Sequence, residues 1–237
     1  GPARIGSFCQ EAFMWLIPVL MGVGYLLGSI PSGFLIVRVF SGQDVRQMGS
    51  GRTGGTNVMR AAGFWPGLLT ALLDMLKATA SVWIAKAVLP LDIQPLGMAL
   101  AGLCAILGHN YSLFLKFKGG AGGAPCVGGA IGIWPWSGLI IVPLGAGVLF
   151  GIGYASVATL SAAFFATALF AYRFYARAPG AEAEFFVVYG LGSVILLAWA
   201  LRPNIQRLIR GEERVVGWRA RRLKQANVAE SSSSGER

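Results

Sequence analysis

The sequence is poor in charged residues and in cysteines. Only 13% of its 237 residues are charged, whereas a soluble globular domain carries about 25%. The three cysteines, Cys9, Cys104 and Cys126, form an odd set whose spacing matches no zinc motif, and two lie within apolar runs. The low charge argues against a water-soluble globule, and we interpret the cysteines as small core residues.

The usual catalytic signatures are also missing. The chain has one histidine, His109, and no Gly-x-Ser-x-Gly sequence. Any Ser-His-Asp set would therefore have to include His109. A lone histidine in an apolar segment is more often a hydrogen-bonded packing residue, so this alternative stays beside a role in binding.

Long apolar runs dominate what is present. The chain is 55% hydrophobic, with a mean hydropathy of +0.62, and a membrane-spanning helix needs ~20 apolar residues. Seven segments are expected to span or enter the bilayer: 13–40, 67–89, 96–115, 121–134, 137–153, 154–172 and 185–201. The fourth is short and glycine-rich, which is tolerated at membrane depth only where protein covers it or it lines a cavity. The sequence predicts an all-α polytopic membrane helical bundle.

The basic residues predict its orientation. The net charge is +10, and in a seven-span arrangement fifteen Lys and Arg fall on one side against four on the other. The richer side is expected to be cytoplasmic, which puts the N-terminus outside and the C-terminus in the cytoplasm. We attribute the basic excess to contact with anionic membrane lipids and expect no nucleic acid partner. Residues 1–211 form the expected single domain, and 212–237 a basic, then serine-rich, cytoplasmic tail. The oligomeric state is left open.

A polar, glycine-rich loop at residues 41–60 separates the first two segments. Five glycines allow backbone N–H groups to converge on one anion. Thr56 is expected to cap a short helix, 57–62, that Gly63 ends. Thr56 and Arg60 would then share a face, which favours phosphate binding at the helix start. The alternative is a plain flexible loop.

Further polar residues interrupt the apolar segments. Lys116 and Lys118 adjoin a glycine hinge after the third segment, and they suit either phosphate binding or an ordinary cytoplasmic flank. Asp74 and Lys77 lie three residues apart in the second segment. Because charges inside a span are costly, they are expected to pair or to face a cavity, and we favour a structural ion pair.

Taken in order, these motifs resemble the PlsY family, the bacterial acyltransferases that acylate glycerol 3-phosphate from acyl phosphate. Seven stretches carry the likeness, with spacing kept from about residue 22 to 211: 24–33, 49–51 with 55–60, 73–77, 108–111, 117–120, 154–156 and 204–208. The resemblance implies a seven-span fold in the inner membrane with its active site open to the cytoplasm.

The resemblance also implies a reaction and a set of site residues. The sn-1 hydroxyl of glycerol 3-phosphate would take the acyl group of an acyl phosphate, giving lysophosphatidic acid, without cofactor or metal. Catalytic roles fall on Ser50, Arg60 and Asn204. Substrate-binding roles fall on Arg52, Thr56, Asn57, His109, Lys118, Gly119, Gly120 and Ser156.

The sequence departs from the family pattern inside its motifs. Ala121 stands where the family has a lysine, and Leu201 where it has a histidine, while Arg52 replaces an asparagine. Two lost phosphate contacts would weaken the site unless the Arg52 cation replaces the missing lysine. The alternative function is therefore a weakened or inactive family member that binds lipid or a partner protein.

The charge asymmetry yields a topological prediction. A cysteine introduced at Ala178 should react with a membrane-impermeant reagent in intact cells, and one introduced at Ser231 should not, each relative to the unsubstituted chain. Reaction at Ser231 but not at Ala178 would reverse the assigned orientation.

Overall fold

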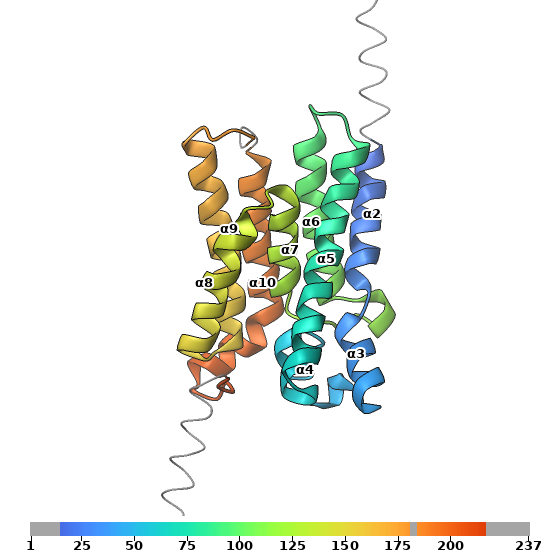
Figure 1. Cartoon of the computed structure of the whole chain (residues 1–237), viewed down its shortest axis with the longest axis vertical. Coiled ribbons are helices and arrows are strands. Elements are labelled where there is room, and N and C mark those ends of the chain that lie inside the picture. Colours follow the sequence, from blue (N-terminus) through green and yellow to red (C-terminus); the bar gives the residue numbers. More distant parts are fainter. Residues whose placement is uncertain (1–14, 181–183, 217–237) are drawn as a thin grey trace, which may run out of the picture.

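The computed structural model describes residues 15–180 and 184–216, and regular structure in these ranges is helical (Figure 1). The helices are α2 (Leu16–Ser29), α3 (Ser32–Ser41), α4 (Gly55–Ala62), α5 (Phe64–Val88), α6 (Gln94–Asn110), α7 (Gly123–Ile133), α8 (Ser137–Ile152), α9 (Ala155–Tyr175) and α10 (Phe185–Ile209), with 3-10 turns η1 (Val45–Gln47) and η2 (Leu113–Leu115). The all-α prediction is confirmed for the described part of the chain. The predicted tail beyond residue 216 and the start of the first segment lie outside it.

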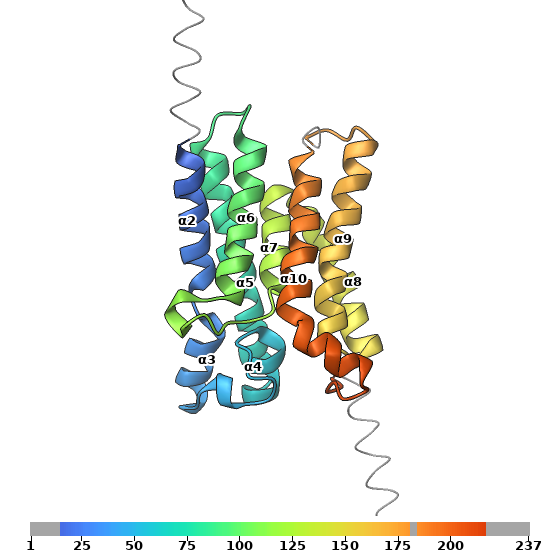
Figure 2. The same cartoon turned by 180° about the vertical axis from the view of Figure 1, so that it is seen from behind.

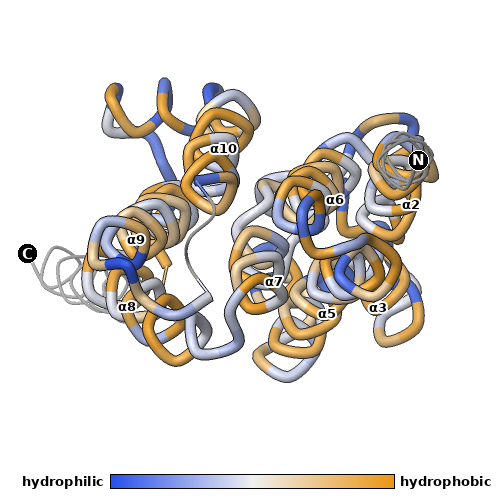
Figure 3. Tube along the Cα trace, turned by 90° about the horizontal axis from the view of Figure 1, so that it is seen from above, coloured by the Kyte–Doolittle hydropathy of each residue, from blue (hydrophilic) through white to orange (hydrophobic). Residues whose placement is uncertain are grey.

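The helices have the length and surface of membrane spans. Among the described residues, five segments are long and apolar enough to cross a bilayer: Leu16–Ser41, Phe64–Val88, Gln94–Leu115, Ala155–Tyr175 and Phe185–Ile209. Large apolar side chains face outward, among them Leu139 and Ile195, which are 70% and 68% exposed. The trace is hydrophobic along most helical turns (Figure 3). Such a surface suits lipid rather than water, and the chain is a polytopic membrane bundle.

The helices form two groups joined by α7. Helices α2, α5 and α6 lie on one side, α8, α9 and α10 on the other, and α7 lies between them in both views (Figures 1 and 2). Helix α2 begins at one end of the bundle and α10 finishes at the other. The α3–α4 loop, α4 and the end of α10 gather at that second end (Figure 2). The polar loops are thus concentrated where the chain also leaves α10.

Small residues allow the first helices to approach closely. Gly24 and Gly28 of α2 face the backbone of Ala101 and Ala105 on α6, where a Cβ on either glycine would collide with a carbonyl oxygen. The Ser29 hydroxyl donates to the Gly108 carbonyl at 3.4 Å. Close contact of small residues is a main source of helix association in lipid. This α2–α6 contact fixes the position of the chain break that follows α2.

The predicted first segment is broken in the structure. Helix α2 ends at Ser29 and α3 begins at Ser32, because Pro31 has no backbone N–H to continue the helical hydrogen bonds.

The third predicted segment also divides, since α6 ends at Asn110 and η2 follows. The seventh extends past its predicted end, because α10 continues through Pro203 to Ile209.

The short helix after the polar loop differs from its prediction at the start. Helix α4 begins at Gly55 with Gly54 as its N-cap, and no side chain caps it. The expectation that Thr56 caps this helix is therefore wrong, since Thr56 already lies in its first turn. Gly63 does end the helix, as predicted, with a φ of 96° that few other residues adopt.

The α2–α6 contact can be tested by adding one methyl group. Gly28→Ala should destabilise the protein by about 1–3 kcal/mol, because the new Cβ would overlap the Ala105 carbonyl. Gly147→Ala in α8 is the control, because its Cβ would meet open space. We expect a lower thermal unfolding temperature in detergent for the first variant alone. Equal unfolding temperatures would show that α2 and α6 do not pack this closely.

Candidate active site

A cavity of about 420 Å³ lies where the polar loops gather. Its walls come from the α3–α4 loop, α4, α5, the turn before α7, the start of α9, the end of α10 and residues 212–214. Polar or charged lining residues include Ser50, Arg52, Thr56, Asn57, Arg60, Asp74, His109, Ser156, Asn204, Arg207, Glu213 and Arg214. Most residues predicted for the site therefore line one cavity, although they are spread over about 150 positions of the sequence.

Three helices begin at this cavity. The first residues of α4 (Gly55 and Thr56), of α7 (Gly123 and Ala124) and of α9 (Ala155 and Ser156) all line it. The first N–H groups of a helix have no partner within that helix, and they carry the positive end of its dipole. At α9 the Ser156 N–H already donates to the Glu213 carboxylate, so the starts of α4 and α7 are the ones that favour a ligand anion such as phosphate.

Arg60 presents a free cation to the cavity. Within residues 15–180 and 184–216 its guanidinium makes no hydrogen bond and no ion pair, so its N–H donors are available to a ligand. Desolvation by the surrounding protein and repulsion from Arg214 lower the pKa of Arg60, and attraction to Glu213 opposes this. A guanidinium stays protonated despite such shifts, so Arg60 supplies a permanent positive charge.

Arg52 joins three parts of the wall. Its guanidinium donates to the carbonyl of Gly120 at 2.8 Å, to the Ala200 carbonyl and to Asn204 Oδ1 at 3.3 Å. Burial, with repulsion from Arg207, lowers the pKa of Arg52. Gly120 and Ala200 directly precede Ala121 and Leu201, the two positions that lack the family's lysine and histidine. The Arg52 cation thus lies beside both substitutions.

Asn57 holds the polar loop in shape. Its Oδ1 accepts from the Ser50 N–H at 2.9 Å, and its Nδ2 donates to the carbonyls of Met48 and Arg52 at 3.0 and 2.8 Å, and to that of Val45 at 3.2 Å. The Asn57 side chain is buried, and these contacts occupy its amide. Although it borders the cavity, Asn57 positions Ser50 and Arg52 rather than offering donors to a ligand.

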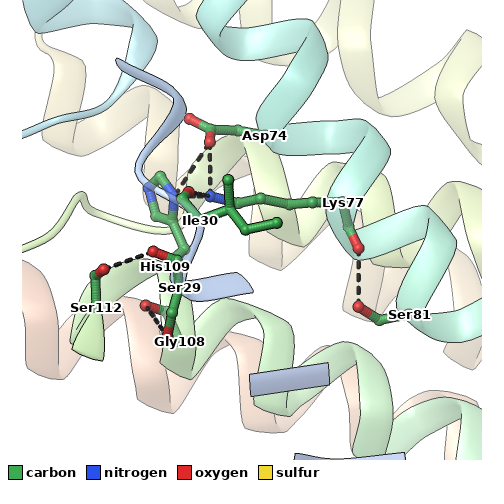
Figure 4. Close-up of polar contacts among 8 residues, drawn as sticks. All are labelled: Ser29, Ile30, Asp74, Lys77, Ser81, Gly108, His109 and Ser112. Carbon is green, nitrogen blue, oxygen red and sulfur yellow. Dashed lines mark hydrogen bonds and ion pairs between the residues drawn. The ribbon is translucent and has the colours of Figure 1, made fainter. Parts of the chain in front are cut away.

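Asp74, Lys77 and His109 form a buried cluster at the cavity (Figure 4). Lys77 Nζ lies 2.8 Å from Asp74 Oδ1, 3.1 Å from His109 Nδ1 and 2.8 Å from the Ile30 carbonyl. The predicted ion pair of Asp74 and Lys77 is confirmed. His109 Nδ1 lies within hydrogen-bond distance of Lys77 Nζ and His109 borders the cavity, so its position suits both a packing role and a binding role.

Lys118, Gly119 and Gly120 do not line the cavity. Lys118 is exposed. The amide groups of Gly119 and Gly120 donate to the Asn110 and His109 carbonyls at 3.2 and 2.9 Å. The two glycine amides are therefore occupied within the protein, and the substrate-binding role expected for Lys118, Gly119 and Gly120 stays a prediction. Gly120 also contributes its carbonyl to Arg52.

The family model for glycerol-3-phosphate acyltransferase matches residues 18–211. A relative named glycerol-3-phosphate acyltransferase from Thermosipho melanesiensis is 37% identical over 199 residues, covering 83% of this chain and 92% of its own. One from Bordetella pertussis is 36% identical over 201 residues, covering 84% and 91%. The chain belongs to the glycerol-3-phosphate acyltransferase family.

Solved structures support the same family. A crystal structure of PlsY, an integral membrane glycerol 3-phosphate acyltransferase, in its glycerol 3-phosphate form has a TM-score of 0.71 and 32% identity, covering 85% of this chain and 96% of that one. The lysophosphatidic acid form has a TM-score of 0.67 and 31% identity, covering 85% and 95%. The PlsY resemblance of the sequence motifs is thereby confirmed.

Sequence reasoning missed part of the acyltransferase cavity. Arg207, Glu213 and Arg214 line it, yet in the sequence they belong to a run rich in basic residues that looks like a lipid-facing flank. The only sequence signal for Glu213 was that it is an acidic residue within a basic run. Its burial, at 8% exposure, marks it as part of the site.

The role of Asn57 is testable by hydrogen exchange. Asn57→Ala should increase amide exchange across residues 45–57, because four hydrogen bonds that shape the loop would be lost. Gln47→Ala, at an exposed position of the same loop, is the control and should leave exchange unchanged. Unaltered protection in Asn57→Ala would show that the loop holds its shape without this amide.

Proposed function

We propose that this chain transfers the acyl group of an acyl phosphate to the sn-1 hydroxyl of glycerol 3-phosphate, giving lysophosphatidic acid and phosphate. The observation that carries the proposal is the convergence of Arg60, Arg52 and the N-termini of α4 and α7 on one cavity. Both substrates bear phosphate, which such donors neutralise and orient. The solved PlsY structures are of a glycerol 3-phosphate form and a lysophosphatidic acid form.

The proposed mechanism relies on positioning. Arg60 and the start of α4 hold the phosphate of the acceptor, and Ser50 lies beside them in the wall. Arg52 and Asn204, which are hydrogen-bonded to each other, hold the phosphate of the donor. The acceptor hydroxyl attacks the acyl carbon, the carbon–oxygen bond to phosphate breaks, and the hydroxyl proton leaves with the phosphate. Acyl phosphate is already activated, so orientation and charge stabilisation carry the step without a protein nucleophile.

We further propose a seven-span topology in the cell inner membrane. Helix α2 together with α3, then α5, α6, α7, α8, α9 and α10 are the seven segments, of which α7 and α8 are short. The placement of the α2 start and the α10 end at opposite ends of the bundle supports an odd number of crossings (Figure 1). The charge count of the sequence, fifteen basic residues on one side of a seven-span arrangement against four on the other, supports a cytoplasmic active site.

One feature of the cavity supports the alternative of a weakened enzyme. Ala121 and Leu201 both line it and offer no charged donor where the family pattern has lysine and histidine. The position of Arg52 beside both supports a rebuilt site instead, because one cation can substitute for another that reaches the same phosphate.

The reaction is tested by measuring lysophosphatidic acid formed from acyl phosphate by the purified chain in liposomes. Formation should require added glycerol 3-phosphate, and Arg60→Ala should reduce kcat/KM about 100-fold, as expected for a guanidinium–phosphate contact. Arg210→Ala removes an equal charge from an exposed position outside the cavity and should change little. Equal losses in the two variants would refute the phosphate site at Arg60, and an inactive wild type would refute the reaction.

We test whether Arg52 replaces the charge of the missing lysine by removing the cation at position 52 and introducing one at position 121. Arg52→Asn should abolish activity, because it removes the cation that joins Gly120, Ala200 and Asn204. Ala121→Lys in that background should restore part of it by returning a positive charge to the neighbouring turn. An Arg52→Asn variant as active as the wild type would refute the compensation and leave the reaction itself standing.

A further inference from the structure

After α10 the chain turns back across the cavity as a strap, residues 211–216. The Val216 N–H donates to the Gly153 carbonyl at 2.7 Å, and Val215 pairs with Tyr154 in an isolated β-bridge. The Arg214 guanidinium donates to the Gly49 carbonyl at 2.9 Å. These contacts tie the strap to the start of α9 on one side and to the polar loop on the other. Between them they place Glu213 inside the cavity wall.

Glu213 holds Ser156 through both of its carboxylate oxygens. The Ser156 hydroxyl donates to Glu213 Oε2, and the Ser156 N–H donates to Oε1 at 3.4 Å. Ser156 is 1% exposed and Glu213 is 8% exposed, and both line the cavity. A carboxylate in this position is stabilised by the N-terminus of α9.

This contact determines what Ser156 can offer to a ligand. An ionised carboxylate only accepts hydrogen bonds, so the single hydroxyl proton of Ser156 is committed to Glu213. The serine oxygen then has only lone pairs left. It can accept a hydrogen bond from a ligand hydroxyl, whereas a phosphate oxygen would meet those lone pairs and a carboxylate behind them. The surroundings of Ser156 therefore disfavour the phosphate contact that the family resemblance implies.

We infer that Glu213, acting through Ser156, forms a hydroxyl-recognition site that selects an acceptor by its sn-2 hydroxyl. The inference rests on the proposed function, in which Arg60 holds the acceptor phosphate. Glu213 and Arg60 line the same cavity. In glycerol 3-phosphate the sn-2 hydroxyl is the nearer of the two hydroxyls to phosphate, and it is the one that does not react. Glu213 is thus a positioning residue that determines acceptor specificity.

The test compares two acceptors in matched variants. Glycerol 3-phosphate has the sn-2 hydroxyl, and 3-hydroxypropyl phosphate lacks it while keeping the reacting hydroxyl and the phosphate. Glu213→Gln should lower kcat/KM for glycerol 3-phosphate ~10-fold or more, as expected for a hydrogen bond that depends on a charged group. It should change kcat/KM for 3-hydroxypropyl phosphate less than about 3-fold. Ser156→Ala should give the same pattern, and Glu213→Asp should recover part of the selectivity.

Glu184→Gln is the charge control, because it removes the same charge at an exposed position outside the cavity. It should leave the ratio of the two acceptors unchanged. A purely structural role of Glu213 would lower both acceptors equally, and that result would overturn the inference. If Glu213→Gln fails to fold, judged by thermal unfolding in detergent, the Ser156→Ala ratio decides in the same way. If the wild type turns over glycerol 3-phosphate and every variant keeps the wild-type selectivity, this inference alone is overturned. If the wild type shows no turnover, both the proposed function and this inference are overturned.

Discussion

The ammonium group of Lys77 connects the parts of the bundle that enclose the cavity. Inside a membrane every backbone carbonyl that leaves a helix needs a donor, because lipid supplies none. The break at Pro31 deprives the Ile30 carbonyl of its helical partner, and it accepts instead from the Ser32 N–H at 3.0 Å and from Lys77 Nζ at 2.8 Å. Asp74 neutralises the lysine and His109 Nδ1 lies 3.1 Å from its Nζ, so α2, α5 and α6 meet at one buried cluster. Removing either charge alone would leave the other buried and unpaired, which is strongly destabilising.

That cluster explains how an anion site can lie beside apolar helices. It holds the first three long helices while the chain leaves helical structure at residues 30–31 and again after Asn110. The interruptions bring the polar loop and the short helix α7 to the cavity, where the starts of α4, α7 and α9 converge. Backbone N–H groups at the helix starts, together with Arg52 and Arg60, then supply the positive potential in the cavity. The site depends on the broken helices as much as on its charged side chains.

Much of this arrangement could be predicted from the sequence, because span length and charge asymmetry are direct consequences of the bilayer. The seven apolar segments correspond to helices, and the ion pair of Asp74 with Lys77 follows from the cost of a lone charge in lipid. Contacts between distant segments could not be predicted. The neighbouring sequence does not show that the Asn57 side chain hydrogen-bonds within the polar loop, or that the Gly119 and Gly120 N–H groups have backbone partners. It also does not show that the chain after α10 returns and brings Glu213 into contact with Ser156. Residue identity gave the candidates for the site, and long-range packing decided which of their atoms remain available to a ligand.

We propose that the cavity beside Arg60 holds the acceptor phosphate. The most direct measurement is a crystal structure of the chain with bound glycerol 3-phosphate. We expect the phosphate within hydrogen-bond distance of the Arg60 guanidinium, next to the first residues of α4. A phosphate bound instead at the exposed Lys116 and Lys118, with the cavity free of ligand, would contradict it.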